Sequence, residues 1–437
     1  MFIVKIEPYN RDRELLKLQL STNTGLETIL TINSFNCFNQ YILDPNPISL
    51  DILYFTSIIY AIDKLIPRVE ANDNWSRDIT VSIPVSNKEL WKTAIEPLKL
   101  ALDFLTSDNW ILLFEDIQEP YYTNRDRRLL PDVYFYTVCL FSGGLDSLAG
   151  VIDTIDEKDN ILLVSHIDGS GASMPIQKPL IRKIKNAYPD KNIEQSVFRV
   201  YTNNNNKETT TRGRSILFHG LALFHSINLE VKEVIASENG VISINLPLTP
   251  SRTCSNSTKT MHPYFLKMFQ DALTILNIDV QINNPYLLKT KGEMLLENRN
   301  PQLVRELATK TLSCSHGGGH TKGWNRQSYN CGYCIPCTIR RASIHAFDTL
   351  LDKDFDYGHG LNGLEINLRE KEKRLDLLAL SYFLKRKLNH RELKREINLM
   401  AKLDNVTEIA YMLERGYTEI EEYIMAKGDS SIKRLFS

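Results

Sequence analysis

The chain has 437 residues, 43% of them hydrophobic and 24% charged, and its 52 Lys and Arg nearly balance its 53 Asp and Glu. This balance argues against a general nucleic-acid binder, which normally carries a basic excess. No apolar run reaches the ~18 residues of a membrane span, and the charged start lacks the apolar core of a signal peptide. We therefore expect a cytoplasmic protein of two or three domains.

Residues 1–130 are predicted to form a small N-terminal α+β domain. Apolar residues alternate over 79–85, which is typical of a half-buried strand. Asn87 follows in a position to cap a helix over 88–106, and a further strand is predicted at 110–116. No catalytic pattern is visible in this region.

Residues 131–345 alternate buried strands with helices, and this pattern predicts an α/β fold with a doubly wound parallel sheet. The continuous apolar strands are typical of a sheet that is covered on both faces. A helical region with charged, solvated faces is predicted over 346–437. The strands are expected at 134–141, 160–168, 196–202, 232–239 and 279–285, with helices between them.

The segment between the first strand and first helix of this sheet carries a phosphate-binding pattern. Two adjacent glycines let the backbone pass close to an anion, and the helix N-terminus adds the positive end of its dipole. An aspartate beside phosphate needs a cation between them, so Mg²⁺ is implied. A tight, capped turn without a ligand is the alternative. The residues are Ser142, Gly143, Gly144, Leu145, Asp146 and Ser147.

Four of the seven cysteines form a C-x16-C-x2-C-x2-C pattern. In a chain whose other cysteines are scattered, this spacing favours a closed metal site, and four thiolates suit structural zinc (Zn²⁺). His316 and His320 are competing fourth ligands, and an iron–sulfur cluster is an alternative. The predicted ligands are Cys314, Cys331, Cys334 and Cys337.

The stretch SGGLDS resembles the SGGxDS signature of the ATP pyrophosphatase (PP-loop, HUP-like) superfamily. The resemblance implies that the loop grips the pyrophosphate leaving ATP. It also places the adenine near Ser165 and His166 at the end of the second strand, with 168–171 as a loop over the nucleotide. A packed histidine is the alternative for His166.

A narrower resemblance is to the QueC family, the 7-cyano-7-deazaguanine synthases, over residues 134–345. CGYCIPCTIRR resembles the end of that family's catalytic domain. RGRSILF (212–218) resembles its arginine–asparagine segment, with Ser215 in place of asparagine, and NPYLLKTKGEM (284–294) resembles its P-hydrophobic-x-x-x-T-K segment. The resemblance implies that Arg214 and Lys291 stabilise charge in the transition state, together with Asp146. The stretch 246–263 departs from the family's YPDCR-like element.

The added regions 1–130 and 346–437 also depart from QueC. This layout resembles the QatC family, the QueC-like proteins of the Qat anti-phage system, and relatives found with cyclic-nucleotide defence systems. The resemblance implies an ATP-dependent carbon–nitrogen ligase that adenylates 7-carboxy-7-deazaguanine, releases AMP and pyrophosphate, and passes the acyl group to ammonia or a protein amine.

Two other functions stay open at this point: an ATP-binding sensing subunit of a defence complex without turnover, and a tRNA-modifying PP-loop enzyme. For partners we expect the small 7-deazaguanine carboxylate and a protein of a defence system. Neither nucleic acid nor membrane is expected as a partner, and homodimerisation stays open.

Overall fold

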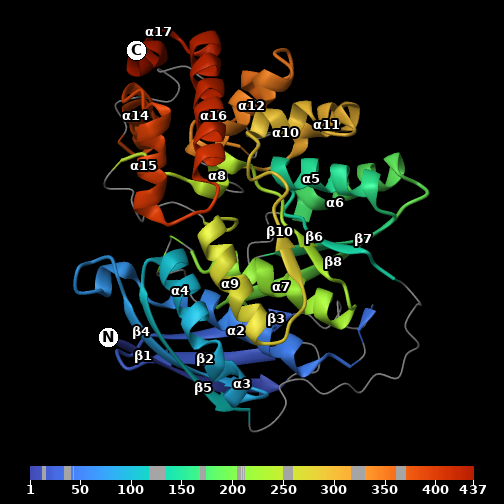
Figure 1. The fold of residues 1–437 in the computed structure, drawn as a ribbon, viewed down its shortest axis with the longest axis vertical. Coiled ribbons are helices and arrows are strands. Elements are labelled where there is room, and N and C mark those ends of the chain that lie inside the picture. The colour runs from blue at the N-terminus through green and yellow to red at the C-terminus, as the bar shows by residue number, and fades with distance from the viewer. Residues whose placement is uncertain are drawn as a thin grey trace.

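The computed structural model describes residues 1–11, 16–33, 41–42, 44–117, 134–167, 174–203, 208, 210, 212–249, 259–315, 330–360 and 371–437. In this part of the chain the framework is one ten-stranded mixed sheet, mostly parallel, in the order β10-β9-β6-β7-β8-β3-β2-β1-β4-β5. Helices pack on the sheet, and a group of C-terminal helices lies beyond it (Figure 1). The chain is therefore an α/β protein, as the alternation of elements predicts.

The five strands from β10 to β8 in this order are parallel to one another. The earliest of the five in the sequence, β6, lies between β7 and β9, so the strand order reverses at this point. In open α/β sheets, ligands bind in the crevice at the carboxyl ends of the strands beside such a reversal. The strands are β6 (Thr137–Leu140), β7 (Asn160–Ile167), β8 (Asn192–Thr202), β9 (Glu233–Ile235) and β10 (Gln281–Asn283).

Helices cover both faces of these strands. Ile161 and Leu163 of β7 belong to one apolar core, whereas Leu162 and Val164 belong to another on the opposite face, as the two-residue repeat of a strand requires. The first core includes residues of α5 (Leu145–Glu157), α6 (Met174–Ala187), α10 (Lys291–Leu296), α11 (Pro301–Leu307) and α12 (Ile335–Phe347). The second includes residues of α2 (Pro47–Leu65), α7 (Arg214–Asn228) and α9 (Pro263–Ile275).

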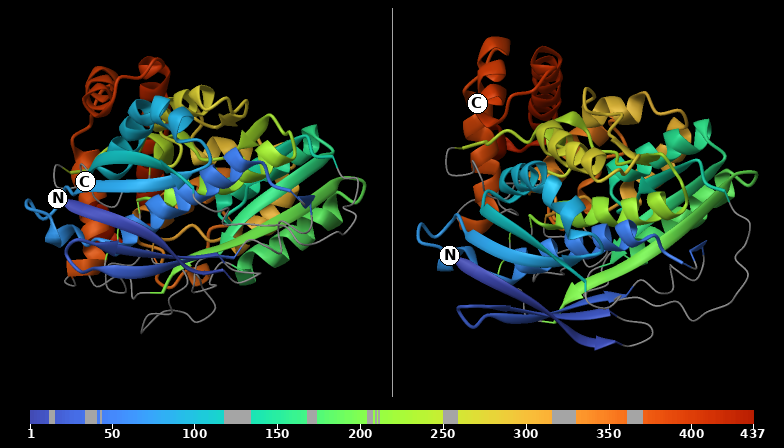
Figure 2. Two further views of the ribbon diagram at one scale, coloured as in Figure 1. Left: turned by 90° about the horizontal axis from the view of Figure 1, so that it is seen from below. Right: turned by 60° about the horizontal axis from the view of Figure 1, so that its bottom comes forward.

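The N-terminal region continues the same sheet (Figure 2). Three antiparallel strands come first, and β3 pairs with β8 through Leu30 opposite Thr202 and Ile32 opposite Val200. The N-terminal region and the parallel strands thus share one sheet and one apolar core. The domain boundaries at 130/131 and 345/346 remain predictions from the sequence. The elements are β1 (Phe2–Arg11), β2 (Leu16–Thr22), β3 (Glu27–Asn33), β4 (Asp78–Val85), α3 (Lys88–Thr93), α4 (Ile95–Thr106) and β5 (Asn109–Asp116).

The helix predicted over 88–106 begins where expected but is divided. Asn87 accepts a hydrogen bond from Leu90 N at 3.1 Å and caps α3. The helix then breaks at Ala94, which separates α3 from α4. Proline at position 97 explains the break, because it has no N–H for the carbonyl of Thr93 and its ring collides with that carbonyl in a continuous helix.

The C-terminal helices form a third apolar core together with α8 (Gly240–Ile244) and the cysteine segment. They agree with the helical region predicted for this part of the chain. None of the described helices is long and apolar enough to cross a lipid bilayer. The helices are α14 (Lys371–Lys385), α15 (His390–Met400), α16 (Val406–Lys427) and α17 (Ser430–Phe436).

A buried ionic network joins α2 to the start of β4 and β5. The fully buried Arg77 donates from Nη2 to Asp63 at 2.6 Å and to Asp108 at 2.5 Å. Arg68 also pairs with Asp108, at 2.8 Å. Because each carboxylate is matched by a guanidinium and further backbone bonds, the charges are tolerated inside the protein.

We predict that Arg77→Met lowers the free energy of unfolding by about 3–5 kcal/mol, because the buried Asp63 loses its nearest cation and Asp108 keeps only Arg68. Urea denaturation followed by circular dichroism measures the change. Lys88→Met, which breaks a surface ion pair with Asp116, is the control and should leave the denaturation midpoint nearly unchanged. Equal midpoints for Arg77→Met and the wild type would contradict the prediction.

Candidate functional site

The predicted phosphate loop leaves β6 and opens α5 at the strand reversal. Gly143 has φ of +82°, which favours glycine. Gly144 is the N-cap of α5 and has no side chain to cap the helix. Ser142 Oγ accepts a hydrogen bond from Gly144 N at 3.2 Å and lies 3.2 Å from Ser147 Oγ. Two hydroxyls and a helix N-terminus are thus gathered at one point, an arrangement that suits an anion.

Both glycines are packed closely by other segments. A Cβ on Gly144 would lie 3.2 Å from the carbonyl oxygen of Leu312, and one on Gly143 would lie 3.1 Å from Gln177 Cγ. Leu312 N donates to Gly143 O at 3.0 Å. The loop therefore depends on residues far away in the sequence for its shape.

Asp146 lies in the first turn of α5 between two donors from other elements. Asn239 Nδ2 donates to Oδ2 at 2.9 Å, and Lys291 Nζ lies 3.2 Å from Oδ1. Lys291 is 4% exposed. The structure thus brings together Asp146 and Lys291, two of the residues that the sequence predicts for one site, from opposite parts of the chain.

Glu238, which the sequence analysis did not single out, belongs to the same cluster. It follows β9, and its carboxylate accepts from Ser243 Oγ at 3.3 Å. Burial raises the pKa of Glu238 to about 8, and the negative charge of Asp146 adds to this. A glutamate directly after a short buried strand, at the carboxyl edge of the sheet, is the signal that could have identified it.

Arg214, predicted to stabilise transition-state charge, and the two residues predicted near the adenine contact groups other than Asp146. Arg214 is exposed at the start of α7, 5.1 Å from the Phe218 ring, and among the described residues it has no ion pair with Asp146. His166 is buried between Tyr60 and Phe218, and its Nε2 lies 3.0 Å from Val200 O. Ser165 Oγ donates to Phe141 O at 2.8 Å.

The contacts of His166 agree with the packed-histidine alternative. Parts of two other predictions cannot be placed on the fold, because the predicted loop over the nucleotide at 168–171 and the stretch 250–258 lie outside the described residues.

The four cysteines come together at the start of α12. Their sulfurs all lie within 4.8 Å of one another, with Cys314 3.9 Å from Cys334 and Cys331 3.8 Å from Cys337. Zn–S bonds of about 2.3 Å in a tetrahedron place sulfurs ~3.8 Å apart. The cluster can therefore bind a metal such as zinc. The competing ligands His316 and His320 lie outside the described residues.

Local structure suits thiolate ligands in this cluster. Gly332 has φ of +92°, and the backbone N–H groups of Cys331 and Cys334 donate to sulfurs, each at 3.3 Å. Cys334 is the N-cap of α12 and Cys337 lies in its first turn, where the helix dipole favours negative charge. Burial raises the pKa of the Cys334 and Cys337 thiols well above the usual value, so a bound cation would have to offset this cost.

A short segment connects the cysteine cluster to the phosphate loop. Ser313 Oγ accepts from Leu145 N at 3.2 Å, while the Ser313 carbonyl lies 3.8 Å from Cys337 Sγ. Asn330 Oδ1 accepts from Ser313 N at 3.0 Å. The segment 311–314 thus contacts the four-cysteine cluster on one side and the predicted phosphate loop on the other.

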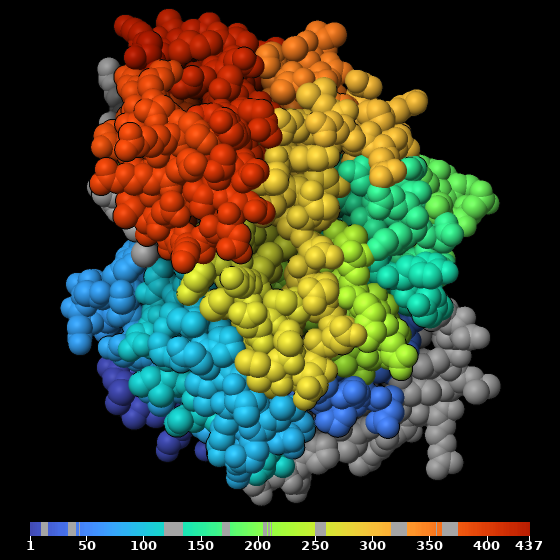
Figure 3. All heavy atoms as spheres, viewed as in Figure 1, coloured from blue at the N-terminus to red at the C-terminus, as the bar shows by residue number. Residues whose placement is uncertain are grey.

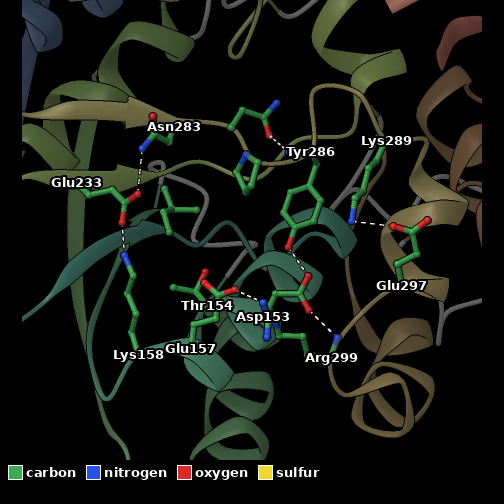
Figure 4. A pocket seen from close by; sticks show the side chains of 13 residues that line it. Asp153, Thr154, Glu157, Lys158, Glu233, Asn283, Tyr286, Lys289, Glu297 and Arg299 are labelled. Carbon is green, nitrogen blue, oxygen red and sulfur yellow. Dashed lines mark hydrogen bonds and ion pairs between the residues drawn. The ribbon is translucent and has the colours of Figure 1, made fainter. Parts of the chain in front are cut away.

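A pocket of about 630 Å³ lies along the second half of α5 (Figure 4), away from Asp146. Its charged side chains pair with one another, which leaves little unmatched charge for a ligand. It is therefore a weaker candidate than the loop. The pairs are Lys158 with Glu233, Tyr286 with Asp153, Lys289 with Glu297, and Arg299 with Glu157.

The sequence matches no protein-family model and no curated protein.

The cysteine cluster predicts a tightly bound metal ion. We expect about one zinc per chain by elemental mass spectrometry, and Cys337→Ala should lose it and lower the melting temperature. Cys139→Ala, which removes a buried cysteine outside the cluster, is the matched control and should keep the metal. Full metal content in Cys337→Ala would contradict the prediction.

The pKa of Glu238 predicts a pH dependence of stability. Its ordinary value is 4.5 and its folded value about 8, so the unfolded chain releases this proton first. The stability that the group contributes is complete below pH 4.5 and is lost as the pH rises to about 8.

Glu238→Gln should therefore have a melting temperature close to that of the wild type at pH 5, and a higher one by several degrees at about pH 8. Thermal melts without divalent cations measure this difference. Glu422→Gln, at an exposed position of α16, should follow the wild type at both pH values. A difference between Glu238→Gln and wild type that is independent of pH would refute the assignment.

Proposed function

We propose that this protein is a QueC-like, PP-loop ATP-dependent ligase that adenylates a 7-deazaguanine carboxylate and transfers it to ammonia or a protein amine. The observation that carries the proposal is the joint position of the SGGLDS loop and Lys291. The loop lies at the strand reversal of the parallel strands, and Lys291, the lysine of the P-hydrophobic-x-x-x-T-K segment, lies 3.2 Å from the loop's Asp146.

The chain's own residues supply binding and charge neutralisation. Ser142, Ser147 and the start of α5 would hold the phosphates that leave as pyrophosphate. Lys291 would turn from Asp146 toward the negative charge that develops between carboxylate and triphosphate. Arg214 is proposed as a second cation, and Ser165 and His166 as neighbours of the adenine.

The residues present fit Mg²⁺. Oδ1 of Asp146 is buried and pairs with Lys291 at 3.2 Å, but it accepts no hydrogen bond from a described residue. The Glu238 carboxyl group lies nearby, and a bound cation would favour its ionised form. Carboxylate oxygens are the ligands that Mg²⁺ prefers. Bound by Asp146 and Glu238, the ion would neutralise phosphate charge. Zn²⁺ is proposed for the four cysteines, as a structural ion, because four sulfurs leave no open position.

The acceptor and the biological setting rest on the resemblance to QueC and QatC families. We propose an anti-phage defence role and a protein amine as the acceptor, because the regions 1–130 and 346–437 offer docking surface that ammonia does not need. A sensing subunit without turnover and a tRNA-modifying enzyme are the other outcomes that the test distinguishes.

The test is mass spectrometry of purified protein with Mg·ATP and 7-carboxy-7-deazaguanine, with and without ammonium. We expect AMP and an amide or nitrile base, or AMP and an acylated protein amine. Asp146→Asn should lower AMP formation by about 100-fold or more, because it removes charge where the reaction develops it. Asp153→Asn, on the same helix but paired with Tyr286, should retain activity.

ATP binding by the wild type without AMP would refute the ligase and favour the sensing subunit. AMP formed in a parallel reaction that contains tRNA in place of the deazaguanine would favour the tRNA-modifying enzyme. Equal activity of Asp146→Asn and wild type would refute the role of the loop aspartate.

A further inference from the structure

One face of α16 lies against both segments that contact Asp146 (Figures 1 and 3). Met412, Arg415, Gly416 and Glu419 are spaced by three and four residues and therefore share one side of the helix. This side meets the start of α8, which follows Asn239, and the start of α10, which begins with Lys291.

Glu419 holds the N-terminus of α10. Its carboxylate accepts from the Thr290 hydroxyl and, at 3.3 Å, from Gly292 N. These two groups flank Lys291 in the sequence. A Cβ on Gly292 would lie 2.6–2.9 Å from the Glu419 carboxylate, so glycine is needed for this approach. The Glu419 carboxylate thus occupies the space that a side chain at position 292 would fill, next to the backbone of Lys291.

Arg415 adds a second contact one turn earlier. It donates to Leu288 O at 3.0 Å and pairs with Glu293, whose carboxylate completes the capping box of α10 with Thr290. Since α10 has six residues, it has few helical hydrogen bonds of its own to maintain its position. Its orientation therefore depends strongly on these outside contacts.

The other end of the same face packs on α8. Cβ atoms placed on Gly240 and Gly416 would lie 2.5 Å from Met412 Cε and 2.3 Å from Val241 Cγ2, respectively. Asn239, directly before Gly240, donates to Asp146 and caps α8. Helix α16 therefore supports both side chains that hold the Asp146 carboxylate.

Burying the Glu419 carboxylate costs free energy, so its position needs an explanation. Among the described residues it forms no ion pair, and burial raises its pKa to about 7. Replacing such a group by an apolar one is often neutral or stabilising. The geometry nevertheless directs both carboxylate oxygens to the two residues next to Lys291.

We propose that Glu419 of α16 is a positioning residue that holds Lys291 against Asp146, so that the C-terminal helices complete the site. The effect on turnover rests on the proposed function, whereas the effect on Lys291 does not. The contact is made within this chain, by helix α16, which lies outside the residues that resemble QueC.

The test measures how fast Lys291 is acetylated by an N-hydroxysuccinimide ester, read by peptide mass spectrometry on the full chain. In the wild type Lys291 is buried and paired with Asp146, so it should react slowly. In Glu419→Ala we expect its rate to rise about tenfold or more, because a charge-assisted bond that keeps α10 closed is lost. Lys310, at the surface, reports the reagent's activity and should react at one rate in all variants.

Two milder variants keep the test decisive if Glu419→Ala does not fold. Glu419→Gln retains one acceptor oxygen for Thr290 or Gly292, so its rate should be intermediate. Gly416→Ala should raise the rate as well, since a Cβ there displaces α16 from Val241. Glu422→Gln, on the same helix, is the control with wild-type labelling. Wild-type labelling of Lys291 in folded Glu419→Ala and Glu419→Gln would overturn the proposal.

The AMP assay separates this proposal from the proposed function. If both hold, Glu419→Ala should lower kcat more than it changes the KM for ATP, because Lys291 acts on charge that develops in the transition state. If the wild type forms no AMP but Lys291 labelling still rises in Glu419→Ala, the ligase fails and the positioning role stands. A loss of kcat with unchanged labelling overturns the positioning role.

Discussion

Two hydrogen bonds connect the four-cysteine segment to the predicted phosphate loop. Leu312 N donates to the carbonyl of Gly143, and Leu145 N donates to the hydroxyl of Ser313. They join the segment before Cys314 to the turn between β6 and α5. The four-cysteine cluster holds that segment from behind, so a metal bound there would influence the loop through three residues of backbone. A metal bound by the four cysteines would thus help to fix the shape of the turn at Gly143.

Several carboxyl groups lie close together around Asp146, and their mutual repulsion and burial cost free energy. Asp146 and Glu238 lie close enough for the negative charge of one to raise the pKa of the other, while Lys291 offers one cation. Glu419 adds a further half-buried carboxylate at the back of Lys291. Burial raises the pKa of both glutamates, to about 8 for Glu238 and about 7 for Glu419, whereas the pocket in Figure 4 is lined by ion pairs such as Lys158 with Glu233.

Much of the fold could be predicted where a local pattern exists. The alternation at 79–85, the cap at Asn87, the buried strand before the phosphate loop and the cysteine spacing all appear in the structure. The pairing of β3 with β8 could not be predicted, because backbone hydrogen bonds between distant strands have no signature in the side chains. Helix α2 is buried on almost every side, and it therefore lacks the one-sided periodicity that identifies a surface helix.

The candidate site was predicted in part for the same reason. The loop residues and Lys291 lie in motifs with a defined spacing, and the structure brings them together. Glu238 has no motif around it, and its place after a short strand indicates a site only once β9 is known to lie beside β6. Arg214 was predicted from a segment match, its guanidinium lies over Phe218, and its role stays a prediction.

The pairing of β3 with β8 also limits how the molecule can move. Backbone hydrogen bonds across this pair make the N-terminal strands and the parallel strands one continuous plate. A hinge between the two regions would have to break four successive residue pairs of the ladder at once, from Leu30–Thr202 to Asn33–Arg199. Any opening around the predicted phosphate loop would therefore have to move elements outside this plate, such as the C-terminal helices, which lie beyond the sheet.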